Sequence, residues 1–244
     1  MVIYYDFSGV FHWPHNHLTG IQRVECGIYK GFIQNNFDIK PIYFDSNSNA
    51  FYQISIDELP VAVKNFIFDK NDEPRLNSSE IPKNKDSRIK CFLKKFRVLR
   101  KLADWYYNNK NIRLAKLKLI PPKNEFRPKA GDIVFSASAS FAIPFHTQKL
   151  NTFFFRNIFI IRVIYDLIPT LKPHWAIPDP KIFTQSSIEQ IEFSSIILTI
   201  SNFSKNEILK FSSSQNLRHS KIEVIRLADK LGNTFPSINS EIKV

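Results

Sequence analysis

Residues 158–165 read IFIIRVIY, a stretch in which Arg162 is the single charged residue. A near-continuous apolar run of this length is typical of a strand covered on both faces, as in the centre of a parallel sheet. A second run, SIILTIS at 195–201, follows a predicted helix at about 179–193. Strands that alternate with helices in this way predict an α/β fold with an open, mostly parallel sheet.

The same alternation extends through most of the chain. Apolar residues at steps of three and four predict an amphipathic helix that opens near Gly20. Ser204, with Glu207 three residues later, has the capping-box pattern and predicts a short helix from Ser204 to about Phe211. Pro41 indicates an edge strand or a strand start. The remaining predicted elements are strands at 2–7, 39–44, 51–56, 131–138 and 221–227 and helices at about 57–67 and 88–109.

Length and composition exclude several classes of protein. The chain has 244 residues, 43% of them hydrophobic and 23% charged, which excludes a mostly disordered chain. No apolar run is long enough for a transmembrane helix, and MVIYYDFSG lacks the features of a signal peptide. Two distant cysteines, Cys26 and Cys91, do not make a disulfide framework. We therefore expect a cytoplasmic protein, with peripheral attachment to the inner face of the membrane left open.

Positive charge is concentrated in one segment. The formal net charge is +12, and residues 83–129 hold 16 basic and 3 acidic residues, so the remainder of the chain is almost neutral. This segment resembles a basic helical insertion into the sheet. A partner with negative charge would meet the protein there, although a merely solvated face of a lysine-rich sequence gives the same pattern. The residues predicted to contact a membrane are Lys94, Lys95, Arg97, Arg100, Lys101 and Trp105.

Glycine-rich nucleotide-binding motifs are absent from the sequence. The six glycines build neither GxGxxG nor GxxxxGK[ST], and no GxSxG elbow occurs. His12, His15 and His17 lie close together, and Asp6 could add a carboxylate, but this spacing is weak evidence for zinc. A surface or substrate-facing loop is the favoured interpretation, and neither a metal nor a cofactor is predicted.

Two short stretches carry candidate chemistry. In LTGIQRVE (18–25), Gly20 lies at a loop–helix junction where backbone N–H groups and Arg23 could hold a phosphate or carboxylate. The alternative is that Thr19 caps the helix and Gly20 shapes the turn. In VIYDLIPTLKPHW (163–175), Asp166 follows a strand, at the end where open α/β sheets bind ligands. It could orient hydroxyls or act as a base, or begin a turn before Pro169.

These stretches, with TISNFSKNEIL (199–209) and KIEVIRLAD (221–229), resemble the N-terminal half of retaining GT-B glycosyltransferases of family 4, also called glycosyl transferases group 1. Thr19–Val24 matches a TGIxRV-like helix start. Residues 165–169 match an HDLIP-like segment, with Tyr165 in place of the usual histidine. Ser201 and Ser204 match a VSxxS helix start, and 225–229 match a VIPLG strand loosely, without its glycine. The resemblance covers about residues 1–43 and 131–232.

The resemblance implies a Rossmann-like acceptor-side domain over residues 1–232, interrupted by the insertion at about 83–129, with 233–244 beginning an interdomain linker or tail. It implies sugar transfer from a nucleotide-sugar to a saccharide or lipid-linked acceptor in cell-surface polysaccharide synthesis. Asp166 would be catalytic, and the residues that bind substrate would be Thr19, Gly20, Gln22, Arg23 and Tyr165. The family's donor site lies in a second domain with two glutamates separated by seven residues, a spacing that no glutamate pair has here. We therefore expect the acceptor-side half alone, inactive without a donor-binding domain.

Two further hypotheses come from other classes. The chain could be a non-catalytic module that docks a membrane or a partner enzyme through residues 83–129. It could also bind nucleic-acid phosphates through the same segment, but no nucleic-acid-binding motif accompanies the charge, so this is the weakest of the three.

Overall fold

The structure is a computed structural model, and it describes residues 2–12, 18, 20–68, 124–138, 143–175 and 180–225. Several sequence predictions fall outside these residues. They are the helix at 88–109 with its six proposed membrane contacts, nearly all of the basic segment, Thr19, and the stretch 226–244.

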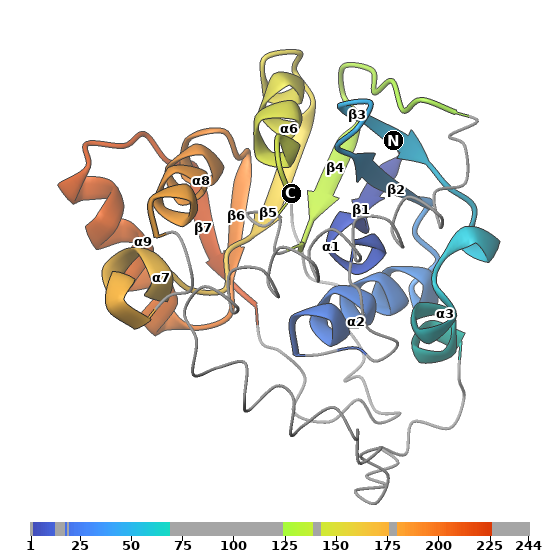
Figure 1. The fold of residues 1–244 in the computed structure, drawn as a ribbon, viewed down its shortest axis with the longest axis horizontal. Coiled ribbons are helices and arrows are strands. Elements are labelled where there is room, and N and C mark those ends of the chain that lie inside the picture. Colours follow the sequence, from blue (N-terminus) through green and yellow to red (C-terminus); the bar gives the residue numbers. More distant parts are fainter. Residues whose placement is uncertain are drawn as a thin grey trace, which may run out of the picture.

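A seven-stranded sheet forms the centre of the fold, in the order β3-β2-β1-β4-β5-β6-β7 (Figure 1). Neighbouring strands are parallel except for β3, which pairs antiparallel with β2. This confirms the predicted α/β class with a mostly parallel sheet, in a Rossmann-like arrangement. The strands are β1 (Ile3–Asp6), β2 (Ile39–Asp45), β3 (Ala50–Gln53), β4 (Ile133–Ser136), β5 (Phe159–Val163), β6 (Ile196–Thr199) and β7 (Lys221–Val224).

Helices cover both faces of the sheet. The side chains of β4 alternate between them, because successive residues of a strand point to opposite faces. Phe135 packs in a cluster with α2 and α3, whereas Val134 packs in a cluster with α6. Helices α8 and α9 pack against β6 and β7 in a third cluster. The helices are α1 (Ser8–Phe11), α2 (Gly20–Gln34), α3 (Val61–Phe68), α6 (His146–Phe154), α7 (Ile168–Leu171), α8 (Pro180–Glu192) and α9 (Asn202–Ser214), with 3-10 turns η1 (Ile56–Glu58) and η3 (Pro173–Trp175).

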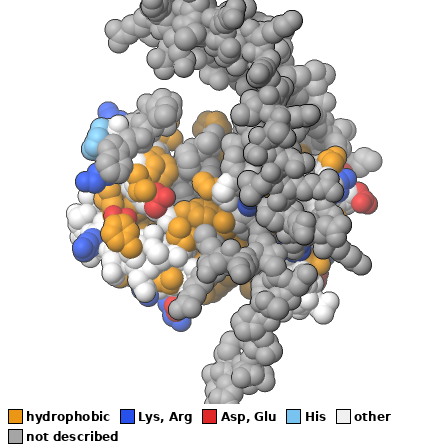
Figure 2. Space-filling view, turned by 90° about the horizontal axis from the view of Figure 1, so that it is seen from below, with side chains coloured by type: hydrophobic (Ala, Val, Ile, Leu, Met, Phe, Trp, Pro, Cys, Tyr) orange, Lys and Arg blue, Asp and Glu red, His pale blue; other side chains and the backbone are white. Residues whose placement is uncertain are grey.

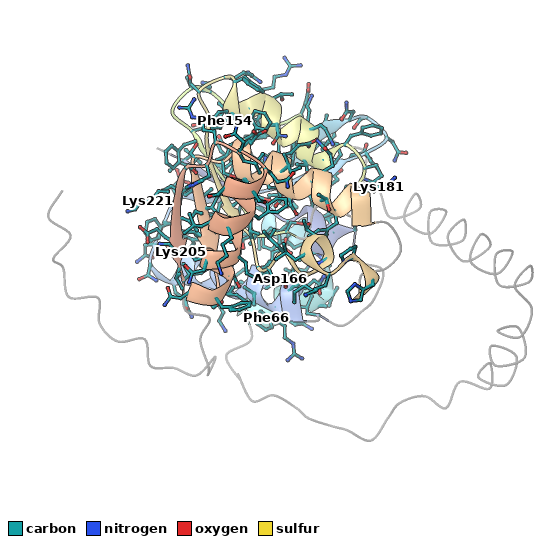
Figure 3. The ribbon with its side chains drawn as sticks, turned by 90° about the vertical axis from the view of Figure 1, so that its left-hand side faces the viewer. Phe66, Phe154, Asp166, Lys181, Lys205 and Lys221 are labelled. Carbon is teal, nitrogen blue, oxygen red and sulfur yellow. The ribbon has the colours of Figure 1, made fainter. Side chains whose placement is uncertain are left out.

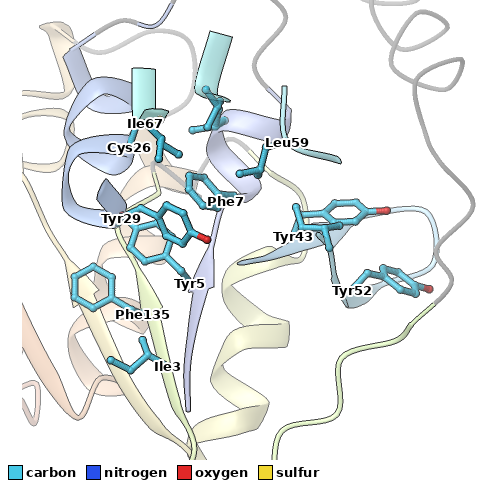
Figure 4. Close-up of a cluster of buried hydrophobic side chains, with 14 of the residues drawn as sticks. Ile3, Tyr5, Phe7, Cys26, Tyr29, Tyr43, Tyr52, Leu59, Ile67 and Phe135 are labelled. Carbon is cyan, nitrogen blue, oxygen red and sulfur yellow. The ribbon is translucent and has the colours of Figure 1, made fainter. Parts of the chain in front are cut away.

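Aromatic rings fill the core between β1 and α2 (Figure 4). Tyr5 of β1 is fully buried, and its ring stacks on that of Phe135 with centroids 5.3 Å apart and 10° between the planes. The ring of Tyr29 meets Tyr5 edge-on at 5.2 Å and Phe7 at 4.7 Å. Buried aromatic pairs of this kind contribute about 0.5–1.5 kcal/mol beyond the area that they bury. They fix α2 against β1, which is an interior strand of the sheet.

Several elements differ from the sequence prediction, including the short helices α1 and α7, which were not predicted. Pro41 lies in β2, which has β1 on one side and β3 on the other, so it is not in an edge strand. Proline has no backbone N–H to donate, and it is tolerated at this position because β3 pairs with β2 only from Ile42 onward. Beyond that ladder, the carbonyl of Pro41 accepts a hydrogen bond from the backbone N–H of Ile54. Helix α6 was not predicted at all, and helix α9 begins earlier than expected.

The start of α9 is set by Ser201 rather than by Ser204 and Glu207. Ser201 has extended backbone geometry, and its Oγ accepts a hydrogen bond of 3.0 Å from the backbone N–H of Ser204. Helix α9 therefore runs from Asn202 to Ser214 instead of from 204 to 211. The capping-box prediction, which made Ser204 the first residue of the cap, was wrong. The backbone N–H of Ser204 donates to Ser201, so Ser204 lies inside the helix and Glu207 has no role in the cap.

We predict that Ser201→Ala lowers the free energy of unfolding by about 1 kcal/mol, because it leaves an N–H group at the helix start without its acceptor. Urea unfolding followed by circular dichroism measures this change. Ser213→Ala is the matched control, since Ser213 lies in the same helix, is exposed, and bonds only to the carbonyl of Leu209. A larger loss from Glu207→Gln than from Ser201→Ala would contradict the assigned cap.

Candidate functional site at the carboxyl ends of the strands

Between strands β1 and β4, the connections of the chain change from one face of the sheet to the other. The connection after β1 runs through α2 on one face, whereas the connection after β4 runs through α6 on the other face. The carboxyl ends of two such strands leave a crevice between the diverging loops, and open α/β sheets bind their ligands there. The residues that end or follow β1, β4 and β5 are therefore the candidates for a site.

The carboxylate of Asp6 is the hub of this region. It is fully buried at the end of β1 and accepts hydrogen bonds from four donors on three elements. The backbone N–H of Ser8 donates at 3.0 Å and the Ser8 hydroxyl also donates to Oδ1, while Ser136 Oγ donates to Oδ2 at 2.7 Å and His146 Nε2 at 2.8 Å. These bonds join β1, α1, β4 and α6 at one point.

The hydrogen bonds of Asp6 also set its charge. Burial alone would raise the pKa of this carboxyl, but His146 and the donors Ser8 and Ser136 outweigh burial and lower that pKa. Asp6 is therefore ionised in the folded protein. Because an ionised carboxylate can only accept hydrogen bonds, Nε2 of His146 carries the proton.

A buried arginine balances this negative charge. Arg162 on β5 is the register partner of Ser136, which is itself the register partner of Asp6, so the three side chains lie in one row across the sheet. Its Nη2 donates to Oδ1 of Asn151 on α6 at 2.6 Å. Burial lowers the pKa of the guanidinium to about 10, against the opposing influence of Asp6 and Glu189. Even so, the group remains positively charged at neutral pH.

Glu25 on α2 is the least expected member of the region. Its side chain is fully buried, and neither carboxyl oxygen has a hydrogen-bond partner in the structure. The Ser138 hydroxyl, two residues past β4, is also buried and without a partner. Both groups lie against Gly9, where a Cβ atom would be 3.2 Å from Oε2 of Glu25 and would collide with Oγ of Ser138. Only glycine fits at position 9 with these two side chains in place.

Tyr165 joins the region from the end of β5. Its hydroxyl donates to the backbone carbonyl of Ala137 at 3.0 Å, which ties the segment after β5 to the segment after β4. Burial raises its pKa, with smaller contributions from Glu25 and Cys26. The structure therefore brings the predicted substrate-binding Tyr165 together with Glu25 and Ser138, which the sequence did not single out.

The other predicted site residues lie around the rim. Gln22 is buried on the side of α2 that faces the sheet, whereas Gly20 and Arg23 are exposed. Asp166 is half-buried, and its Oδ1 accepts a hydrogen bond of 2.9 Å from the backbone N–H of Ile168. This bond forms the turn that was the alternative interpretation of Asp166. In Figure 3 it lies in the lower half of the molecule, at the end opposite Phe154.

Exposed apolar side chains lie at the same edge of the sheet as Asp166. Ile168 and Leu171 of α7 are 44% and 39% exposed, and Phe203 near the start of α9 is 71% exposed. These segments follow the adjacent strands β5 and β6, so they lie at the same edge of the sheet. Figure 2 looks onto this edge and shows hydrophobic side chains gathered on its described part. Such a surface suits contact with a ligand or partner better than with water alone.

Metal ligation has little support among the residues that the structure describes. They contain no group of three or more His, Cys, Asp or Glu side chains able to hold a metal ion. Nε2 of His12 donates to the carbonyl of Phe44 at 2.7 Å, and the oxygens of Asp6 are taken by the donors named above. His15 and His17 lie outside the described residues.

The buried polar residues of the site gave no clear signal in the sequence. Glu25 sits inside an amphipathic helix, where a charged residue is ordinarily taken as exposed. Ser136 and Ser138 belong to a predicted strand, FSAS, in which serine carries no particular meaning. The one usable signal was position, since Asp6 and Ser138 each lie near the end of a stretch that was predicted to be a strand.

Comparison with known proteins gives no match: no protein family, curated protein or solved structure is detectably similar to this chain. Within the described part of the chain, no helix is both long and apolar enough to cross a lipid bilayer.

We predict that Glu25→Gln changes how stability depends on pH. Burial, and secondarily the charge of Asp6, raises the pKa of Glu25 well above its ordinary value, so the folded protein keeps the proton while the unfolded chain loses it. Between the unfolded and the folded pKa, the wild-type free energy of unfolding should fall as pH rises, by up to about 1.4 kcal/mol per pH unit. The glutamine variant should lack this fall.

Urea unfolding between about pH 5 and about pH 8, a window above the ordinary pKa of glutamate, tests this prediction. Glu58→Gln is the control, because its Oε2 bonds only to the exposed N–H of Ser55. Parallel curves for the wild type and Glu25→Gln would show that Glu25 is not held protonated.

Proposed function

We propose that the chain is the acceptor-side half of a retaining GT-B glycosyltransferase, acting in the synthesis of a cell-surface polysaccharide. One observation supports this above all. The motif stretches that resemble family 4 glycosyltransferases, at 18–25 and 163–175, follow β1 and β5 and therefore meet at the carboxyl edge of one Rossmann-like sheet. That edge is where a fold of this class binds its ligand.

The groups at this edge suit a neutral, hydroxyl-rich ligand. Tyr165 is half-buried and Gln22 is buried. Asp166 offers a carboxylate, and Arg23 is exposed at the first turn of α2. In transfer, an acceptor hydroxyl oxygen bonds to the anomeric carbon of the donor sugar while the bond from that carbon to the nucleotide diphosphate breaks. Asp166 would orient that hydroxyl or receive its proton.

Turnover would also require a donor-binding domain, which the resemblance places in a second Rossmann-like unit. Stabilisation of the leaving diphosphate is typically the largest catalytic contribution in such sites, and one wall of a cleft cannot supply it. We therefore expect transfer only when that domain is present, in the same polypeptide or as a separate chain.

We predict that Arg23→Ala abolishes sugar transfer in the presence of a donor-binding domain, because the variant loses a cation at the rim of the crevice. Incorporation of labelled sugar from a nucleotide-sugar into polymer or lipid measures it. Arg218→Ala is the matched control, since Arg218 is also exposed but precedes β7, at the opposite edge of the sheet. Full transfer by the double variant Arg23→Ala, Asp166→Ala would overturn the proposed function.

Charge favours a second candidate function, in which residues 83–129 dock an anionic membrane or a partner. The local net charge of this segment is +13, from 16 basic and 3 acidic residues. Each basic residue near an anionic surface contributes roughly 1 kcal/mol of binding. Docking and transfer are compatible, because many acceptors of this class would be lipid-linked.

We predict binding to vesicles that contain phosphatidylglycerol, weakening as salt rises, and loss of that binding when residues 88–119 are deleted. Sedimentation with vesicles measures it. Changing Lys181, Lys205 and Lys210 to glutamine is the control and should leave binding unchanged. Salt-independent binding would contradict an electrostatic dock, and binding to duplex or single-stranded nucleic acid with little vesicle affinity would favour the nucleic-acid hypothesis.

A further inference from the structure

Glu25 and Ser138 are two buried polar groups that the fold leaves without partners. Buried polar groups in folded proteins are almost always hydrogen-bonded, to protein, to ordered water or to a ligand. Both carboxyl oxygens of Glu25 and the hydroxyl of Ser138 are exceptions. Because Gly9 contacts both of them, the two groups lie at one place, between the segments that follow β1 and β4.

The pair lies where the core meets the carboxyl edge of the sheet. Ser138 follows β4, and Glu25 lies two residues after Arg23 on the helix that leads away from β1. The carbonyl of Ala137, next to Ser138, accepts the hydrogen bond of Tyr165. The pair therefore lies behind the residues already assigned to substrate binding.

The charges around the pair, and its hydrogen-bond donors and acceptors, indicate what kind of ligand it would bind. Among the described residues, the titratable groups that face Glu25 are Asp6 and Tyr5 on β1, Cys26 on α2, and Tyr165 after β5. None of them is basic, and Asp6 is ionised, so a second negative charge is disfavoured at this place. A protonated Glu25 donates one hydrogen bond and accepts others, and Ser138 does the same. That combination complements a neutral hydroxyl group, whereas the nearby Asp6 carboxylate repels an anion.

We propose that Glu25 and Ser138 form the innermost subsite of the crevice and bind a hydroxyl group of a neutral saccharide. The proposal rests on the proposed function, because it takes the acceptor to be a saccharide. Both side chains are buried, and a buried polar pair of this kind ordinarily holds a water molecule. A sugar hydroxyl can replace such a water without loss when it makes the same hydrogen bonds.

The test uses the full chain and methyl hexopyranosides as probes, with binding measured by saturation-transfer NMR and by titration calorimetry. Glu25→Gln keeps a donor and an acceptor at the same place and should bind as the wild type does. Glu25→Leu and Ser138→Ala should each weaken binding about tenfold, the worth of a hydrogen bond near the top of the usual range. Ser212→Ala is the matched control, because Ser212 is equally buried but lies in α9, bonded to the carbonyl of Ile208.

The dependence on pH separates a binding role from a structural one. Wild-type affinity should fall as Glu25 loses its proton, whereas the affinity of Glu25→Gln should stay constant. If Glu25→Leu bound the probes with the affinity of the wild type while Arg23→Ala lost binding, the proposed subsite would be wrong. The proposed function would still stand. Absence of binding by the wild-type chain to every probe would overturn both. Circular dichroism of each variant shows whether it is folded.

Discussion

The hydrogen bonds of Asp6 are the interaction on which the arrangement of this fold depends. A carboxylate taken out of water is costly unless its oxygens are fully bonded, and Asp6 meets that condition with donors from Ser8, Ser136 and His146. The Ser8 hydroxyl also accepts a hydrogen bond of 2.9 Å from the backbone N–H of Phe44, so β2 joins the same cluster. Loss of the carboxylate would leave several buried donors without an acceptor at the place where the two faces of the sheet diverge. Burial, and secondarily the charge of Asp6, raises the pKa of the neighbouring Glu25.

The two faces of the sheet differ in chemistry at this point. On the α2 face, aromatic rings around Tyr5 and Tyr29 make a rigid apolar support. On the α6 face, a row of polar side chains runs from Asp6 to Arg162 and continues into the helix through Asn151. The hydrogen bonds of this row favour the observed arrangement, because without them the buried carboxylate of Asp6 would lose its donors. The carboxyl edge of the sheet at β1, β4 and β5 is therefore supported mainly by aromatic packing on the α2 face and by polar side chains on the α6 face.

Sequence patterns were sufficient for the sheet but not for the site. The run at 158–165 is buried at most of its positions, and the helix at 20–34 has partly buried apolar residues at steps of three and four, so both elements were predictable from the sequence pattern. Helix α6 was missed because its inward side includes the polar residues His146, Thr147 and Asn151, and because it opens at Phe145 in the left-handed conformation without a side-chain cap. A linear pattern assigns polar residues to solvent. The partners that make these residues internal, such as Asp6 for His146, are far away in sequence and become visible only in three dimensions.

The pairing of β1 with β4 has a consequence for synthesis of the chain. Asp6 and Ser136 are 130 residues apart, yet they lie side by side in the centre of the sheet. During translation, β1 can pair with β2 early, but its other edge stays open until Ser136 has left the ribosome. An open edge in an apolar strand is a template for incorrect pairing with other chains. Closing a long loop costs only slightly more than closing a shorter one, so the fold tolerates a long segment between α3 and β4 in its final stability. The long segment instead lengthens the period during translation in which the edge of β1 is unpaired. During that period the nascent protein can pair incorrectly with other chains.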